Sequence, residues 1–281
     1  MLRFFKREPL LDEESVEWLF EAFGWSLRSF GSVPFYQNTI LVTPTPKHFP
    51  GRGTSIEEMA DLMMNRVKAY AGLSYWPTQA VDHHQFRGDP NDVPSVHQML
   101  QTLTGEGDSQ ELVGASQGDL ILFYEPKQIG SPEVMIANFS HALMVHLAAL
   151  AELAPPCEEE LIPHLTEVMA VTHGFGLMFA NTATPYRGGG CGSCRSPAME
   201  RIGSLSEREV AYALAIFCVL KAIPEKEVTR HLKKTLKGFF KKALVDVNGR
   251  TEMLADLKSI DTPSRFNKHE DAIPTEAGVQ L

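Results

Sequence analysis

Several histidine and glutamate side chains lie in the central part of this 281-residue chain, and these residue types can bind a metal ion. Five of them are of interest: His141, His146, His164, Glu167 and His173. Imidazole nitrogens and carboxylate oxygens are zinc ligands, and zinc makes its bound water a strong nucleophile at neutral pH. The chemistry that these residues could support is therefore metal-assisted hydrolysis.

The spacing of apolar residues predicts how these side chains are positioned. Residues 134–153 and 159–181 carry apolar side chains at helical intervals, and two consecutive prolines separate the two segments, so we expect a pair of packed helices. His141 and His146 are five residues apart, which places them roughly 140° from each other at ~100° per residue. They would share a face only if the helix contained a π-bulge.

Residues 139–145 read Phe-Ser-His-Ala-Leu-Met-Val, and residues 164–181 run from His-Leu-Thr-Glu through Gly-Phe-Gly to Phe-Ala-Asn. The first segment resembles a pattern of the form F-x-H-E-L-x-H, and the second resembles P-L-T-D-L-x-x-V-F-x-G-F-G-x-F-x-A-N. Both patterns occur in a group of bacterial HExxH zinc-metallopeptidase-like proteins. The stretch Pro44-Thr-Pro46 with Phe49-Pro50 is similar to a P-T-P-x-x-F-P segment of the same group.

The resemblance implies a site that has lost part of its chemistry. An HExxH helix places two histidine ligands one turn apart, with the glutamate beside them as general base. Carried onto this chain, the metal positions are His141 and, on the second helix, Glu167. The base position holds Ala142 and the second histidine position holds Val145.

The resemblance therefore predicts a non-catalytic or catalytically impaired metallopeptidase-like protein. Its former cleft would have a binding or regulatory role, with a peptide or protein as partner, and no cofactor is expected. The candidate cleft residues are Asn138, His146, His164 and His173. The alternative is an active zinc-dependent hydrolase with an altered ligand set, in which one of these histidines joins His141 and Glu167.

A second constellation is the pair Cys191 and Cys194 in a glycine-rich stretch. One Cys-x-x-Cys supplies only half of a four-cysteine zinc site, and this pair does not follow a strand at a helix start as a thioredoxin-like motif would. Metal binding, reversible disulfide formation and an inert loop all stay open. A redox or zinc-binding protein is thus a third functional hypothesis.

Composition limits the class of protein and of partner. With 43% hydrophobic and 22% charged residues and a net charge of −9, the chain is typical of soluble globular proteins, and no binding to nucleic acid is expected. No apolar run reaches the ~18–20 residues of a membrane span, and the first residues lack a secretory signal, so we expect a cytoplasmic protein. Charge is uneven, because residues 221–250 carry nine Lys or Arg and three Asp or Glu.

The whole pattern predicts one α+β domain over residues 10–258, mainly helical with a small sheet, and a disordered tail over 259–281. Ser204 and Glu207 have the spacing of a capping box. Residues 72–118 are predicted to be rich in turns. The further expected elements are helices at 12–31 (ending or bending at Gly24), 54–70, 210–223 and 225–247, and strands at 39–43 and 119–124.

Overall fold

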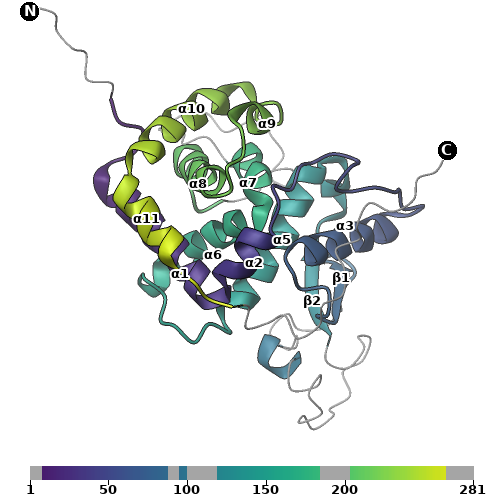
Figure 1. Ribbon diagram of the computed structural model, residues 1–281. Helices are drawn as coiled ribbons and strands as arrows, with labels where there is room; N and C mark the ends of the chain where they lie inside the picture. The colour runs from purple at the N-terminus through teal and green to yellow at the C-terminus, as the bar shows by residue number, and fades with distance from the viewer. Residues whose placement is uncertain (1–7, 88–94, 100–118, 184–202, 264–281) are drawn as a thin grey trace, which may run out of the picture.

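Helices make up most of the molecule, and one small sheet lies at its side (Figure 1). The computed structural model describes residues 8–87, 95–99, 119–183 and 203–263. The predicted class, mainly helical α+β with a small sheet, is confirmed. In the described ranges, none of the helices combines the length and apolar character that crossing a bilayer requires.

Helix α1 (Glu13–Phe30) opens the fold and runs without interruption through Gly24. The side chain of Asp12 accepts a hydrogen bond from the Ser15 N–H at 2.8 Å and so caps the first turn. Gly31, with φ +108°, ends the helix and leads into the short helix α2 (Ser32–Gln37). The expectation that the helix ends or bends at Gly24 was wrong, because this glycine is buried and packs against Leu257.

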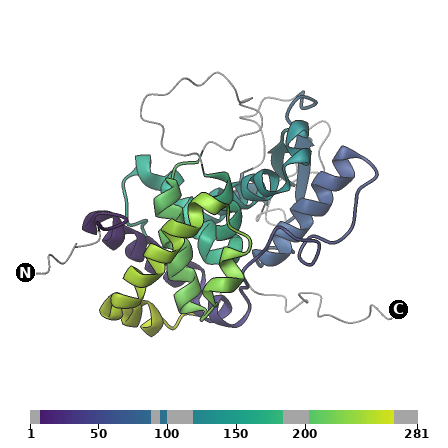
Figure 2. The ribbon, with the colours of Figure 1, turned by 90° about the horizontal axis from the view of Figure 1, so that it is seen from above.

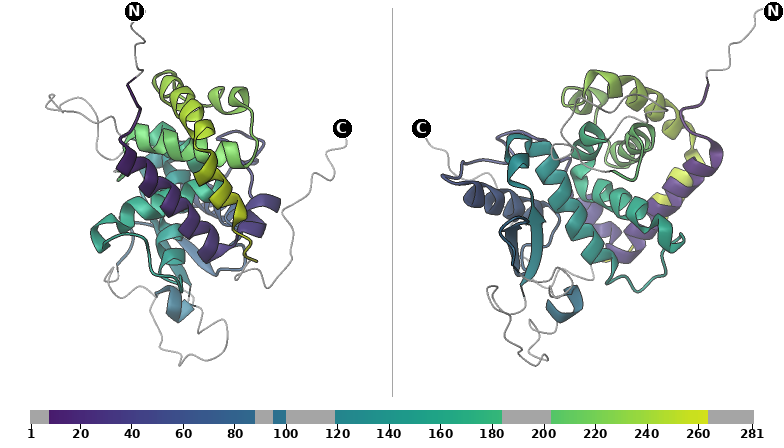
Figure 3. Two further views of the ribbon diagram at one scale, coloured as in Figure 1. Left: turned by 60° about the vertical axis from the view of Figure 1, so that its left-hand side comes forward. Right: turned by 180° about the vertical axis from the view of Figure 1, so that it is seen from behind.

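The sheet pairs two parallel strands, β1 (Thr78–Asp82) and β2 (Leu120–Tyr124). Helix α3 (Ile56–Tyr70), capped by Ser55, packs against β1, while α5 (Pro132–Ala148) packs against β2. Strand β2 was expected, but β1 falls in a stretch for which turns were predicted. The sheet with α3 occupies one end of the molecule, away from the C-terminal helices (Figure 3).

The strand predicted at residues 39–43 is not formed. These residues are anchored instead by a hydrogen bond from the Val42 N–H to the Gly174 carbonyl at 3.0 Å. This contact joins the N-terminal third of the chain to the central helices.

The predicted central helix pair is present, with shorter and broken members. Helix α5 (Pro132–Ala148) ends before the expected residue 153, and a 3-10 turn, η3 (Glu159–Leu161), begins the second segment. That segment is α6 (Ile162–Ala170), a π-helical turn η4 (Val171–Phe175) and α7 (Gly176–Thr182). The break is at Gly174, whose φ is +93°, and an added Cβ there would lie 2.1 Å from the Ile40 carbonyl oxygen. Only glycine fits this close approach without strain.

The C-terminal helices pack over the central pair. Helix α8 (Glu207–Leu220) runs beside α10 (Lys234–Gly249), as Figure 2 shows. Its capping box uses Ser206 and Glu209, two residues later than the predicted pair Ser204 and Glu207. The single helix expected over 225–247 is two helices, α9 (Glu225–Thr229) and α10, and α11 (Thr251–Ser259) follows.

The chain continues in contact with the fold after α11. The Thr262 N–H donates to Ser32 Oγ at 2.9 Å, and the Thr262 hydroxyl donates to the Leu27 carbonyl at 2.8 Å. The first residues of the segment predicted as a tail are therefore held against α1 and α2. Residues 264–281 lie outside the described residues.

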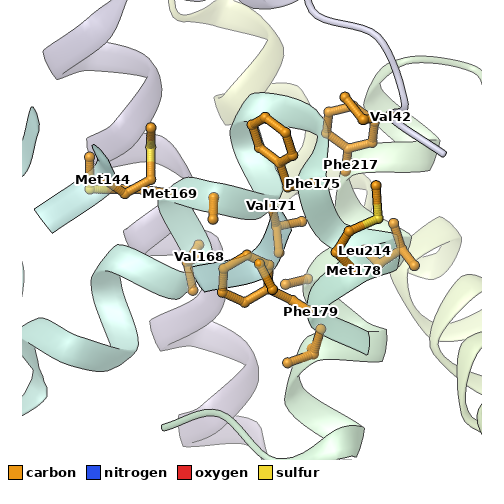
Figure 4. Packing of buried hydrophobic residues seen from close by; sticks show 14 of the residues in the cluster. Val42, Met144, Val168, Met169, Val171, Phe175, Met178, Phe179, Leu214 and Phe217 are labelled. Carbon is orange, nitrogen blue, oxygen red and sulfur yellow. The ribbon is translucent and has the colours of Figure 1, made fainter. Parts of the chain in front are cut away.

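The broken α6–α7 segment forms the centre of the hydrophobic core (Figure 4). Phe175 and Phe179 point into this cluster and have no exposed surface. Met144 of α5, Leu214 and Phe217 of α8, and Val42 surround them. Each such side chain contributes roughly 1.5–3 kcal/mol when fully buried, so this contact fixes how the four segments are arranged.

Candidate functional site

His141 lies on α5 and makes a polar contact with α6. Its Nε2 is 3.0 Å from Thr166 Oγ1, and the Thr166 hydroxyl donates to the Pro163 carbonyl at 3.0 Å. Since a hydroxyl has one proton, the hydrogen between the ring and Thr166 comes from His141 Nε2. His141 is thus a hydrogen-bond donor to α6, and the ring edge also contacts Phe179 with centroids 6.4 Å apart.

Glu167, the next residue on α6, is completely buried. One carboxylate oxygen accepts the Ser204 N–H at 2.8 Å, and the other accepts the Leu205 N–H at 3.0 Å. These two peptide groups lie just before the first residue of the α8 capping box, Ser206. Glu167 therefore holds the start of α8 against α6 with both of its oxygens.

The positions of the missing base and second histidine lie on an accessible stripe of α5. Ala142 is half-buried, and the Val145 side chain is 44% exposed. His146 is half-buried beside them, and burial lowers the pKa of its imidazole. Asn138, one turn earlier, donates from Nδ2 to Gln128 Oε1 at 2.9 Å. This stripe can contact a partner through apolar and neutral groups.

The two histidines of the second segment face different ends of α1. The His164 ring meets Trp18 edge-on at 6.5 Å between centroids, and its buried Nδ1 has no hydrogen-bond partner among the described residues. The His173 ring packs near Phe30 at 6.4 Å. Trp18 and Phe30 are 12 residues apart on one continuous helix, which separates them by about 18 Å at 1.5 Å per residue.

His173 has a structural hydrogen bond. Its Nδ1 donates to the Met169 carbonyl at 2.8 Å. Burial lowers the pKa of the ring, and this hydrogen bond opposes the shift. The ring is therefore a neutral donor that fixes the turn preceding the break at Gly174.

The structure does not assemble these candidates into one cluster. His141 and Glu167 lie on adjacent helices but bond to different partners, and His164 and His173 are directed at opposite ends of α1. Across the described ranges, no three His, Cys, Asp or Glu side chains come together in a way that could hold a metal ion. Cys191 and Cys194 lie outside the described residues.

Asn181, in the last turn of α7, is a buried polar residue whose role the sequence did not reveal. Its Nδ2 donates to Glu133 Oε1 at 2.6 Å and to the His231 carbonyl at 2.8 Å, while its Oδ1 accepts the Lys233 N–H at 3.0 Å. One amide thus connects α7 to the start of α5 and to the turn between α9 and α10. An asparagine near the end of an apolar helix was the only local signal.

A second polar region lies near the ends of the two strands, and the sequence analysis did not predict it. Tyr124 is 4% exposed, and its pKa is raised by burial and by the nearby carboxylates of Glu57, Asp82 and Asp61. Asp82 accepts the His84 N–H at 2.8 Å. These acids come from α3 and β1, so no sequence spacing could have brought them together.

Comparison with known proteins identified no similar protein. Neither a scan against protein-family models nor searches of curated proteins and of solved structures returned a match.

Proposed function

We propose that this chain is a non-catalytic, metallopeptidase-like protein that binds a peptide or protein segment along the accessible stripe of α5. The observation that carries the proposal is the use of Glu167. Both of its oxygens accept peptide N–H groups at the start of α8, so the acidic residue expected to bind metal serves the packing of a helix. A metal bound by this carboxylate would have to share its two oxygens with both N–H groups and would be held at the position that these hydrogen bonds fix.

The remaining positions of the resembled motif support the same proposal. Zinc hydrolysis needs protein ligands, usually three, an open coordination place for water and a base that takes the proton of that water. The base position is Ala142, and general-base catalysis is typically worth ~10²–10⁴ in rate. The position of the second histidine ligand is Val145, whose apolar side chain is 44% exposed.

The binding role rests on what the α5 stripe exposes and on its neighbour β2. Ala142 and Val145 offer a narrow apolar surface, and α5 packs against β2. Within the described part of the chain, β2 pairs with β1 alone, on one edge. An extended peptide can add to a strand by backbone hydrogen bonds while a side chain contacts the neighbouring helix. We therefore place the peptide across the Val145 turn of α5.

Zinc titration by calorimetry, together with metal analysis of untagged protein, tests the non-catalytic proposal. We expect no stoichiometric zinc for the wild-type chain and no peptidase activity. The variant Ala142→Glu with Val145→His adds a base and a ligand on an accessible face, so it should fold normally and gain zinc before any activity. One tightly bound zinc per wild-type chain, lost on His141→Ala, would instead establish the hydrolase with an altered ligand set.

A spin label or fluorophore at a cysteine introduced in place of Val145 tests the binding proposal. A library of short peptides added to this labelled protein should contain members that shift the signal. The same label placed at Glu252, an exposed residue of α11, is the matched control. Peptides that change both labels equally would count against a specific site on α5.

A further inference from the structure

The α9–α10 region carries a dense basic surface on an otherwise acidic protein. We call this surface the basic face, and its seven residues are Lys226, Arg230, Lys233, Lys234, Lys237, Lys241 and Lys242. All except the half-buried Lys237 are exposed. Among the described residues, only Lys241 of this set has a carboxylate within ion-pair distance, Glu225 at 3.0 Å. The other charges are available to an external anionic partner.

An open hollow adjoins the basic face. It lies between the end of α8 and α10 and has a volume of about 420 Å³. Its apolar lining includes Val219, Ile223, Leu244 and Val245. The ion-paired side chains of Lys241 and Glu225 also line it. Val245 is 69% exposed, the largest exposure of any large hydrophobic side chain in the described ranges. A partner with an apolar side chain next to acidic groups would match both features.

The loop between α5 and α6 presents that combination on the same chain. Glu158, Glu159 and Glu160 are exposed, and Leu161 directly after them is 40% exposed. None of the three glutamates forms an ion pair with another described residue. We call residues 158–161 the acidic loop.

The acidic loop and the basic face cannot meet within one copy. Helices α9 and α10 lie at the upper side of the molecule in Figures 1 and 3, and the loop between α5 and α6 lies well below them, at the side of the molecule next to α1. Contact between them therefore requires two molecules. An anionic bilayer fits the basic face less well, because membrane-bound amphipathic helices insert a continuous apolar face. Here Val219, Ile223 and Leu244 line a hollow, and Val245 is the strongly exposed apolar side chain beside them.

We propose that this protein self-associates head to tail, with the acidic loop of one copy bound to the basic face of the next and Leu161 placed in the hollow beside Val245. Such a heterologous contact leaves one free surface at each end, so association continues beyond a dimer unless the rotation closes a ring. The attraction depends on exposed charges and weakens as salt shortens the Debye length. This inference does not depend on the function proposed for α5.

Sedimentation analysis of the full chain at low and high salt tests the proposal. At about 20 mM salt we expect the average mass to rise with concentration to roughly twofold or more above the 31.2 kDa monomer. At about 500 mM salt it should return to the monomer value. A monomer at every concentration and salt, or association that salt does not change, would overturn the proposal.

Charge-reversal variants identify the two surfaces. Lys241→Glu with Lys242→Glu reverses the basic face about one helical turn from Val245, and both side chains are exposed, so the fold should be preserved. Glu159→Lys with Glu160→Lys reverses the acidic loop. Each double variant should stay monomeric alone, and an equimolar mixture of the two should associate.

Two controls separate this contact from general charge effects. Arg52→Glu with Lys258→Glu makes the same change in net charge as the basic-face variant, at exposed sites outside both surfaces, and its association should equal that of the wild type. Combining all four reversals in one chain should restore self-association. The proposed contact is contradicted if the control variant loses self-association as the two surface variants do, or if their mixture does not associate. A protein that stays monomeric and binds phosphatidylserine-containing vesicles through the basic face also contradicts it.

Discussion

Replacing Glu167 with glutamine is the most direct test of the role that the structure gives to this carboxylate. Glutamine keeps the shape and one acceptor oxygen, but it places an NH2 group where the second oxygen accepts a peptide N–H. One hydrogen bond from the Ser204 or Leu205 N–H is then lost, and two donors face each other. A hydrogen bond to a charged group is worth about 1.5–3 kcal/mol, so we expect the free energy of unfolding to fall by about that amount.

The alanine variant sets the upper limit of the effect. Glu167→Ala removes both acceptors and leaves two N–H groups unsatisfied at a buried helix start, at a cost of about 3–6 kcal/mol. Domains of ordinary stability unfold at about 5–15 kcal/mol, so this variant could fail to fold, and the glutamine variant is the informative one. Its unfolding midpoint in urea, measured by circular dichroism, gives the change directly.

Glu160→Gln is the matched control, because it makes the same chemical change at an exposed glutamate. No measurable change in stability is expected there. If Glu167→Gln were as stable as the wild type, the two hydrogen bonds to the start of α8 would not be important for folding. If it lost bound zinc without losing stability, the carboxylate would be a metal ligand.

Three further outcomes follow from buried or strained residues. Gly174→Ala should destabilise the fold by more than about 2 kcal/mol in thermal unfolding, because its φ is +93° and a Cβ would lie 2.1 Å from a carbonyl oxygen; an unchanged melting temperature would contradict this. Cys191 and Cys194, expected from their glycine-rich context to be accessible, should react with a thiol reagent in native protein before Cys218, whose thiol is 1% exposed and has a pKa raised by burial; equal rates would be evidence against it. Burial lowers the pKa of His173, so the unfolded chain binds more protons below about pH 6.5 and stability should fall as the pH drops from about 7 to 5. This slope should be smaller in His173→Asn, and an identical slope would show that the ring does not contribute.

Local sequence patterns were sufficient to predict most helices but not their exact starts. The chain contains two overlapping Ser-x-x-Glu patterns, and the sequence alone favoured Ser204 with Glu207. The structure uses Ser206 with Glu209 because the peptide N–H groups of residues 204 and 205 are bonded to Glu167. The choice between the two patterns depended on a residue 37 positions earlier, which no local rule contains.

The sheet also could not be predicted in full from local sequence patterns. Strand β2 is a buried apolar run and was predictable, whereas β1 is a short segment, mostly half-buried, without clear alternation. Its pairing is parallel and joins residues 42 positions apart in sequence, such as Thr78 with Leu120. Residues 39–43 have strand-like composition, but their backbone is used in a contact with Gly174. Tertiary contacts decided both cases.

For the candidate site, the sequence predicted which helices meet but not what their polar residues do. The pairing of α5 with α6 followed from apolar spacing, and it brings His141 against α6. The hydroxyl that it contacts belongs to Thr166, which carries no signal of function in the sequence. The partners of Glu167 are backbone groups, and these are invisible in any pattern of side chains.

The polar residues of the α6–α7 segment share one physical role, which explains why the segment looks catalytic in sequence. Glu167 bonds to the start of α8, Thr172 to Ser26 of α1 at 2.8 Å, and Asn181 to α5 and the start of α10. A buried polar group is costly unless it is hydrogen-bonded, so each of these side chains favours one register of its neighbouring element over all others. A carboxylate inside an apolar helix can be a metal ligand, but here Glu167, Thr172 and Asn181 align four elements around one segment. A zinc ion that drew Glu167 toward His141 would leave buried N–H groups at the start of α8 without an acceptor, so metal binding by this pair would act against the docking of α8.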